Sequence, residues 1–314
     1  MNKPLLSICI PTYNRVEYLI KCIDSIICQK EFINKQVEIV ISDNASIDNT
    51  FNEIEKYIKK YDNIYYYRNN VNINNDNFPL VLSKGNGILR RLCNDTLCFK
   101  EDSLQYMCQI VKKYEKTKPF ICWTENDKIS EIEELNFEDG MSKASYGITS
   151  IASFSIWEDE CVGLENDVKG TELLLWQVRK TLQLVNLKNR MVLINKNTSF
   201  VQYVPDKNIS YGLFHVFYEN YFKLLNPYFE NGVLSKETKE FLEKDLLINF
   251  FPVWCAKWKL QNTKLQYSKS EDLNMCIYQK YHNKSYWNEY QKKYKYIYFK
   301  LKIKDIIKTF LGRN

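Results

Sequence analysis

The feature that most constrains the fold is an alternation of short apolar runs and amphipathic segments near the N-terminus. Apolar runs at 5–10, 37–42 and 64–67 have the length and composition of buried strands. Between them, apolar residues recur at helical spacing over 16–27 and 54–61. This order of strands and helices predicts parallel strands joined by right-handed crossovers. The sequence therefore predicts a doubly wound α/β domain.

The remaining elements are predicted from weaker patterns. We expect a further strand over 88–93, a helix over 103–114, a loop with strand fragments over 140–155 and a helix over 171–187. Two late runs, 191–195 and 199–204, are expected to pair with each other. From 211 onward the pattern is mostly helical and rich in aromatic residues. We therefore expect a first domain over 1–210 and a helical C-terminal region over 211–314.

Composition excludes several classes of protein. The longest dense apolar run, 246–256, is much shorter than the roughly 20 residues that span a bilayer. The N-terminus leads directly into a strand without a secretory signal, and the ten cysteines form no Cys-x-x-Cys pair. We therefore expect reduced thiols and a cytoplasmic protein. The phosphate-binding patterns of common ATPases and NAD enzymes are absent from the sequence.

Positive charge is concentrated at the C-terminus. Residues 283–314 contain nine basic and two acidic residues, whereas the whole chain has a net charge of only +6. Aromatic residues are interspersed among these lysines. One interpretation is a tail that contacts anionic lipid at the inner face of the cytoplasmic membrane. The other is a terminal helix with solvated lysines and a buried aromatic stripe; contact with nucleic acid is not expected.

Three polar clusters follow the predicted strands. They begin at Pro11, Asp43 and Cys93. In open parallel sheets, ligands bind outside the carboxyl ends of the strands. An acidic residue at such an end accepts hydrogen bonds from a base or a ribose, and a second one holds a hard divalent cation against phosphate oxygens. The spacing therefore predicts a ligand site formed by these clusters.

At these residues the sequence resembles family 2 of the inverting, nucleotide-sugar-dependent glycosyltransferases, which have the GT-A fold. Residues 7–15 look like the first strand of that family with its Pro-Thr-Tyr-Asn turn, and 41–50 look like its second-strand signature. Residues 77–97 occupy the place of the stretch that leads into the DxD motif. The resemblance is specific over 1 to about 110. It implies a Rossmann-like, mostly parallel sheet with helices on both faces, a nucleotide-binding half over 1–100 and an acceptor half over 101–210.

The resemblance also implies roles for individual residues. Pro11, Thr12 and Tyr13 would line the nucleobase pocket. Asp43 would bind uracil or ribose, and Asp95 would hold a divalent metal, Mn²⁺ or Mg²⁺. The full set of residues implied to bind the nucleotide sugar is Pro11, Thr12, Tyr13, Asn14, Asp43, Asn44, Ser46, Asn94 and Asp95.

The chain departs from the family pattern at two places. Its DxD-like segment begins with Cys93, so one carboxylate, Asp95, stands where the fuller pattern has two or three. Mg²⁺ commonly uses only one or two protein carboxylates, so both weaker metal binding and a metal-free enzyme stay open. Arg90 and Arg91 occupy a normally apolar strand. Either one of them reaches the diphosphate or both contact another surface.

Inverting transfer needs a general base for the acceptor hydroxyl. Family 2 enzymes place this base just before a helix in the second half, and the nearest match here is Glu172; Asp167 is the alternative. The resemblance thus implies a hexosyltransferase-like enzyme, with a UDP-sugar donor and a glycan or lipid-linked glycan acceptor of surface polysaccharide synthesis. Two alternatives are a non-catalytic nucleotide-sugar-binding module and a nucleotidyltransferase on a similar frame.

Overall fold

The chain divides into two compact units. The computed structural model describes residues 3–124, 130–202, 211–260 and 271–310. The first unit is Met1–Tyr203 and the second is Val204–Asn314. The boundary drawn from the sequence, between 210 and 211, stays a prediction, and 203–210 lie outside the described residues.

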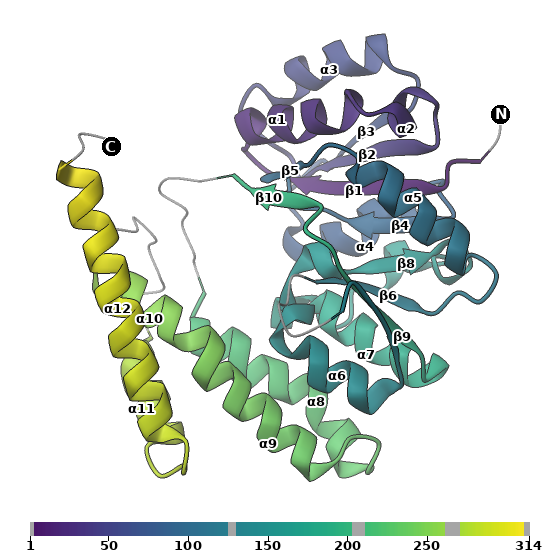
Figure 1. Cartoon of the computed structure of the whole chain (residues 1–314). Helices are drawn as coiled ribbons and strands as arrows, with labels where there is room; N and C mark the ends of the chain where they lie inside the picture. Colours follow the sequence, from purple (N-terminus) through teal and green to yellow (C-terminus); the bar gives the residue numbers. More distant parts are fainter. Residues whose placement is uncertain (1–2, 125–129, 203–210, 261–270, 311–314) are drawn as a thin grey trace. The chain divides into compact units, whose positions relative to one another are not determined.

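The first unit is built on a five-stranded sheet with the order β3-β2-β1-β4-β8 (Figure 1). Its strands are β1 (Leu6–Thr12), β2 (Val37–Asp43), β3 (Ile64–Arg68), β4 (Leu89–Leu92) and β8 (Ser155–Trp157). The first four are parallel to their neighbours, and β8 is antiparallel to β4. The predicted doubly wound α/β architecture is therefore confirmed. Pro11 and Thr12, which the sequence places in a turn, belong to β1.

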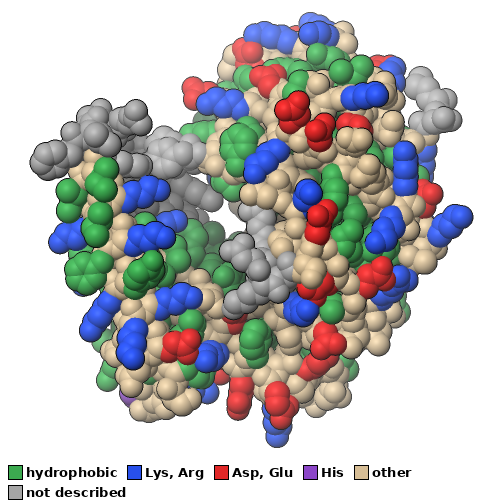
Figure 2. Space-filling view, in the orientation of Figure 1, with side chains coloured by type: hydrophobic (Ala, Val, Ile, Leu, Met, Phe, Trp, Pro, Cys, Tyr) green, Lys and Arg blue, Asp and Glu red, His purple; other side chains and the backbone are tan. Residues whose placement is uncertain are grey.

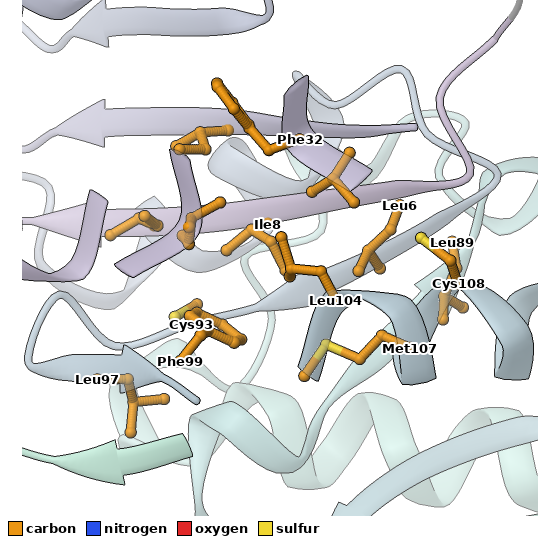
Figure 3. Close-up of a cluster of buried hydrophobic side chains, with 14 of the residues drawn as sticks. Leu6, Ile8, Phe32, Leu89, Cys93, Leu97, Phe99, Leu104, Met107 and Cys108 are labelled. Atoms are coloured by element: carbon orange, nitrogen blue, oxygen red, sulfur yellow. The ribbon is translucent and has the colours of Figure 1, made fainter. Parts of the chain in front are cut away.

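Helices cover both faces of this sheet. The helices of this half are α1 (Val16–Ile27), α2 (Lys30–Ile33), α3 (Thr50–Lys60), α4 (Asn77–Ser83) and α5 (Ser103–Tyr114), with a 3₁₀ turn η1 (Asn74–Asp76) before α4. Leu6 and Ile8 of β1 enter a core with Leu104 and Met107 of α5 (Figure 3). Alternate side chains of β1 face the other way, toward α4, because the side-chain period of a strand is two. Both faces are buried, which explains the nearly continuous apolar runs of these parallel strands.

The late strands do not pair as expected. β9 (Met191–Asn195) is parallel to β6 (Phe120–Thr124) and antiparallel to β7 (Ile132–Leu135) in a three-stranded sheet. β10 (Ser199–Val201) pairs instead with β5 (Leu97–Phe99). The expectation that the two late runs pair with each other is wrong. An apolar run identifies a strand but not its partner, which packing of the whole domain decides.

Two further expectations for the second half are corrected. The segment 140–155 is not a loop with strand fragments, because it contains the end of α6 (Phe137–Ala144) and the 3₁₀ turns η2 (Ser145–Thr149) and η3 (Ile151–Ser153). The helix expected from 171 begins five residues later as α7 (Trp176–Lys188). Gly170 and Leu174 have positive φ angles of 82° and 60°, and such residues interrupt a right-handed helix. The turns between β8 and α7 are η4 (Glu158–Glu160), η5 (Leu164–Asn166) and η6 (Thr171–Leu173).

At the amino-terminal ends of β1 and β2, away from the predicted site, the loop at Gly87 packs closely against the β1 backbone. Glu38 is buried in β2 and accepts hydrogen bonds from Ser7 Oγ (2.6 Å) and from the backbone N–H of Gly87 (3.2 Å). The same N–H of Gly87 also donates to Ser7 Oγ (2.8 Å). These bonds satisfy a carboxyl group that would be costly to bury alone. A Cβ at Gly87 would lie 2.6 Å from the Ser7 backbone nitrogen, so only glycine fits there.

Replacing Gly87 with alanine is expected to lower the free energy of unfolding by about 1–3 kcal/mol, because the methyl group would push β1 away from this loop. Urea unfolding followed by circular dichroism measures the change. Gly147→Ala in η2 is the matched control, because its Cβ would meet only Thr124 Oγ1, at 3.7 Å. We expect the control to stay within about 0.5 kcal/mol of the wild type. Equal stability of the two variants would contradict the prediction.

The cysteines agree with the expectation of free thiols. All ten are unpaired, and eight of them are buried. Burial raises the pKa of the Cys161 thiol to about 11 and that of Cys122 to about 12. Because the thiolate is the reactive form, these buried thiols are poor nucleophiles.

The second unit is helical, as predicted. It contains α8 (Tyr221–Glu230), α9 (Lys236–Asp245), α10 (Phe251–Lys259), α11 (Leu273–Tyr281) and α12 (Trp287–Phe310), with π-helical turns η7 (His215–Asn220) and η8 (Leu246–Phe250). Stacked aromatic rings form much of its core; Phe214 and Phe251, for example, have centroids 5.7 Å apart. Over the described parts of the chain, no helix combines the length and the apolar character needed to cross a membrane.

Candidate functional site

The ends of β1 and β2 bring two of the predicted clusters together. Thr12 and Asp43 are register partners at the carboxyl ends of these parallel strands. Directly beyond them, the backbone N–H of Asn44 donates to the Thr12 carbonyl (2.9 Å). The polar clusters after β1 and β2, which are about thirty positions apart in the sequence, are therefore neighbours at the same edge of the sheet. This is the edge at which open α/β sheets bind ligands.

Asp43 is fully buried and organises the loop that follows β2. Its Oδ1 accepts from the Ser46 backbone N–H (2.9 Å), and its Oδ2 accepts from the Tyr66 hydroxyl. Arg68 Nε lies 4.0 Å from Oδ2. Burial, together with the bond to Asp43, raises the pKa of the Tyr66 phenol, so Tyr66 remains a protonated donor. The geometry gives Asp43 a structural role in shaping the loop, beside the binding role that the resemblance implies.

Asn14 and Ser46 connect the loops after the two strands. The Asn14 backbone N–H donates to Ser46 Oγ (2.9 Å), and Asn14 Oδ1 accepts from the Ile47 N–H (2.8 Å). Asn14 has a positive φ of 52°, a conformation that asparagine tolerates better than most residues. The Tyr13 side chain next to this turn is 42% exposed. An exposed aromatic ring at a fixed turn is a suitable surface for stacking a nucleobase.

An asparagine network supports this edge. Asn44 Nδ2 donates to Asn72 Oδ1 (2.7 Å), and Asn44 Oδ1 accepts from Asn69 Nδ2 (3.1 Å) and from the Ile73 N–H (2.8 Å). Asn77 is buried and bonds to Ser42 of β2. Sequence reasoning missed these roles. The available signal was the asparagine-rich run 69–77, which the sequence indicates only as a loop or the start of a helix.

Asp95 lies beside Thr12, as the strand order requires. Its carboxylate is buried; Oδ2 accepts from Thr12 Oγ1 (2.9 Å), and Oδ1 accepts from Arg15 Nη1 (3.2 Å). The Arg15 side chain is 39% exposed, so its guanidinium also reaches solvent at this edge. Sequence reasoning missed Arg15 as a site residue, although it follows the Pro-Thr-Tyr-Asn segment directly. Asn94 makes the turn after β4 and accepts from the Leu97 N–H through its carbonyl (3.1 Å).

The donor set at Asp95 fits a hard divalent cation only with help from a ligand. Among the described residues, no group of three or more His, Cys, Asp or Glu side chains converges on a metal site. Asp95 provides one buried carboxylate, a hard oxygen donor of the kind that Mg²⁺ and Mn²⁺ bind. Mg²⁺ bound to phosphates typically uses one or two protein carboxylates. The residues therefore fit a metal held largely by a diphosphate, with Arg15 as a fixed positive charge beside it.

The two candidate bases have different surroundings. Glu172 is exposed on η6, and the carbonyl of its neighbour Thr171 accepts from Asn75 Nδ2 of η1 (3.4 Å). This contact places η6, which carries Glu172, against the asparagine-rich segment 69–77 beside the proposed site. Asp167 instead forms ion pairs with Arg179 and with Lys180 (3.0 Å). Those pairs hold the start of α7 and favour a structural role for Asp167.

The two arginines of β4 point to different partners. Arg90 Nη1 donates to the Leu82 carbonyl at the end of α4 (2.8 Å), which leaves it engaged with that helix. Arg91 is buried, donates to the Ala152 carbonyl (3.1 Å), and lies 4.6 Å from the centre of the Trp123 ring. Arg91 also lines a cavity of about 280 Å³ together with Trp123, Lys196 and residues of β10. Both arginines therefore contact other parts of the fold, the second of the two alternatives left open by the sequence.

The N-terminal part of the chain matches a known protein family. The sequence profile of the family described as Glycosyl transferase family 2 matches residues 7–75. The abequosyltransferase RfbV of Salmonella typhimurium is 48% identical over 85 residues, which are 26% of this chain and 25% of that protein. The matched part thus spans about a quarter of the length of this curated relative.

Solved structures are similar over more of the chain. One is S. aureus TarS 1-349 in complex with UDP. The superposition covers 81% of this chain and 77% of the TarS chain, with a TM-score of 0.53 and 16% sequence identity. The mannosyltransferase PcManGT of Pyrobaculum calidifontis, in complex with GDP-Man and Mn²⁺, covers 100% of this chain and 89% of its own, with a TM-score of 0.52 and 13% identity. At these identities the likeness concerns the fold, which is GT-A.

Proposed function

We propose that this chain, which carries the glycosyl transferase family 2 sequence in residues 7–75 and has the GT-A fold, is an inverting glycosyltransferase. It transfers a sugar from a nucleotide diphosphate, UDP in our proposal, to a hydroxyl of a glycan or lipid-linked glycan. The family 2 match and the glycosyltransferases among its relatives support the reaction class. The UDP complex of TarS supports the donor class, while GDP-Man in PcManGT keeps GDP among the nucleotides to be tested.

One observation carries the proposal for the donor site. Thr12 joins the two acidic positions, because it is the register partner of Asp43 and donates its hydroxyl to Asp95. Tyr13, which is exposed, and Arg15, which is partly exposed, flank this pair. A nucleotide needs a flat apolar surface for its base and positive charge for its diphosphate, and these side chains provide both. Among the remaining residues of the proposed site, Asn14, Asn44, Ser46 and Asn94 hold the loops in this arrangement through their hydrogen bonds, and Pro11 of β1 is proposed to line the nucleobase pocket.

In the proposed reaction, the Glu172 carboxylate removes the proton of the acceptor hydroxyl. The acceptor oxygen then forms a bond to the anomeric carbon on the face opposite the diphosphate. The bond from that carbon to the diphosphate oxygen breaks, and the nucleoside diphosphate leaves with the electron pair. Arg15 stabilises the negative charge that develops on the leaving group. Attack from the opposite face inverts the anomeric configuration.

Asp95 is proposed to hold a divalent metal, Mn²⁺ or Mg²⁺. When bound, such an ion supplies additional neutralisation of the diphosphate charge. The presence of Mn²⁺ in the PcManGT structure supports this proposal, and the single carboxylate of this chain predicts a weakly held ion that depends on the nucleotide.

The acceptor is proposed to bind in the second half of the first unit. The cavity of about 280 Å³ lined by Arg91 and Trp123 has room for a sugar ring, and Thr124, Lys196 and Ser199 on its wall carry polar groups that can hydrogen-bond to sugar hydroxyls. A lipid-linked acceptor would place the enzyme at the cytoplasmic face of a membrane. The basic C-terminal helix supports this location by its charge.

Calorimetric titration with UDP, GDP and CDP, each with Mn²⁺ and with EDTA, tests the donor proposal. We expect one nucleotide to bind, with UDP as the proposed one, and its affinity to fall in EDTA. Binding of GDP alone would change the donor class but keep the reaction. Failure of all three nucleotides to bind would overturn the proposed function, and release of pyrophosphate from a nucleoside triphosphate would indicate a nucleotidyltransferase instead.

A further inference from the structure

Helix α12 has two apolar faces, of which one is used inside the second unit. Tyr290 is 6% exposed, and its hydroxyl lies 3.7 Å from Cys255 Sγ of α10. Tyr294, Ile297 and Leu301 continue this stripe at helical spacing and are half-buried. The contacts between α10 and α12 identify this stripe as the inner face. The aromatic stripe expected from the sequence is therefore present, but it accounts for only one side of the helix.

The opposite side of α12 is apolar and exposed. Its members are more than half exposed: Tyr296 (66%), Phe299 (58%), Ile303 (57%), Ile306 (51%) and Ile307 (51%). With about 100° between successive residues, this outer stripe is centred about 180° from the inner one. The space-filling view shows hydrophobic and basic side chains gathered along this helix (Figure 2). Large aliphatic side chains grouped in this way indicate an interaction surface rather than single exposed residues.

Lysines border the outer stripe on both sides. Lys295 and Lys302 lie on one edge at helical spacing, and Lys300 and Lys304 lie on the other. All four are exposed. A central apolar stripe between two rows of positive charge is the pattern of a helix that lies in the plane of an anionic bilayer surface. The same pattern disfavours a second copy as the partner, because a two-fold interface through this stripe would bring like charges together.

We infer that α12 lies flat on an anionic lipid surface, with its outer stripe at the boundary between headgroups and acyl chains and its lysines against lipid phosphates. This inference deepens the proposed function, on which its biological role rests, because a surface-bound enzyme meets a lipid-linked acceptor at the membrane. The helix is about 36 Å long at 1.5 Å per residue, and the inner stripe keeps the rest of the unit on the aqueous side.

Sedimentation of the full chain with vesicles tests the inference. The probes are vesicles of phosphatidylcholine alone and of phosphatidylcholine mixed with phosphatidylglycerol. We expect binding to the mixed vesicles only, with a loss of more than tenfold in the variant Phe299→Ser/Ile303→Ser. The variant Lys295→Gln/Lys302→Gln should lose about fivefold for each lysine, and added salt should weaken wild-type binding. The matched control is Phe241→Ser, which removes a 45% exposed aromatic side chain from α9 and should bind like the wild type.

Two measurements keep the outcomes distinct. Far-UV circular dichroism verifies that the variants keep their helices, and light scattering gives the oligomeric state. The inference is overturned if the wild type does not bind mixed vesicles, if Phe299→Ser/Ile303→Ser binds them equally well, or if that variant converts a dimer into a monomer. Nucleotide titration separates this result from the proposed function. Vesicle binding without nucleotide binding would refute the proposed glycosyltransferase but keep the lipid contact of α12. Nucleotide binding without vesicle binding would refute the lipid contact but keep the proposed enzyme.

Discussion

Replacing Glu172 with glutamine is expected to lower kcat for sugar transfer by about 10²- to 10⁴-fold, the usual contribution of a general base. Glutamine keeps the shape of the side chain but does not accept the acceptor proton. Because Glu172 is exposed on η6 and lies outside the buried core, stability and nucleotide affinity should stay unchanged. Transfer to a soluble acceptor, measured beside calorimetric titration of UDP, checks both parts of the prediction.

Asp167→Asn is the matched control for that experiment. It removes one carboxylate from the same segment, but one that is paired with Arg179 and Lys180. We expect a lower free energy of unfolding and a kcat within severalfold of the wild type. If Asp167→Asn abolishes transfer and Glu172→Gln does not, the two roles are exchanged. If the wild type binds a nucleotide sugar and neither it nor the variants turn it over, the chain is a non-catalytic binding module.

Asp95→Asn is expected to weaken Mn²⁺-dependent nucleotide binding by about 10²-fold or more, since even residues behind a metal ligand commonly contribute 10- to 100-fold. Asparagine retains an oxygen that accepts a hydrogen bond, so one of the contacts with Thr12 and Arg15 survives and the fold should persist. Calorimetry with and without EDTA measures the effect. Asp24→Asn on α1, where Asp24 accepts from the Tyr57 hydroxyl, removes a paired carboxylate away from the site and should leave binding intact.

Nucleotide binding that does not depend on metal would assign the diphosphate charge to Arg15. If EDTA and Asp95→Asn both leave nucleotide affinity unchanged, the metal proposal is wrong. Arg15 then supplies the charge for the diphosphate, and Arg15→Gln should lower the affinity in the absence of metal. The Arg15 guanidinium lies 3.2 Å from Asp95 and its side chain is 39% exposed, so it can neutralise the diphosphate either beside a metal or alone. Comparing Asp95→Asn with Arg15→Gln distinguishes these two roles.

Much of the first half of the fold could be predicted because its information is local. Leu6, Ile8 and Ile10 belong to a run that is apolar on both faces, and the helix after it has a single apolar side. Those patterns fix strands, helices and parallel connections without knowledge of distant residues. The second half resisted prediction because β9 is as apolar as β1 but nothing in its local pattern specifies that β6 and β7 are its partners.

Some residues of the candidate site could be identified from the sequence, and others could not. A strand that ends in Asp43 and another that leads to Asp95 could be identified from the sequence, and the resemblance added roles for them. Arg15 and the asparagine network around Asn44 could not be identified, because their significance comes from hydrogen bonds between separate loops. The hydrogen bond from Asn69 Nδ2, after β3, to Asn77 Oδ1, at the start of α4, is an example (3.2 Å).

The sequence by itself determined the parallel α/β frame, the strand ends at which we propose that the nucleotide binds, and the basic character of the C-terminus. These properties follow from periodicity, strand-end chemistry and charge, which neighbouring residues specify. Only the tertiary structure decided that Thr12 joins Asp43 to Asp95, that Arg91 is buried against Trp123, and that α12 exposes a second apolar stripe. Each of these depends on which surfaces pack together, and a linear pattern specifies the surfaces but not their partners.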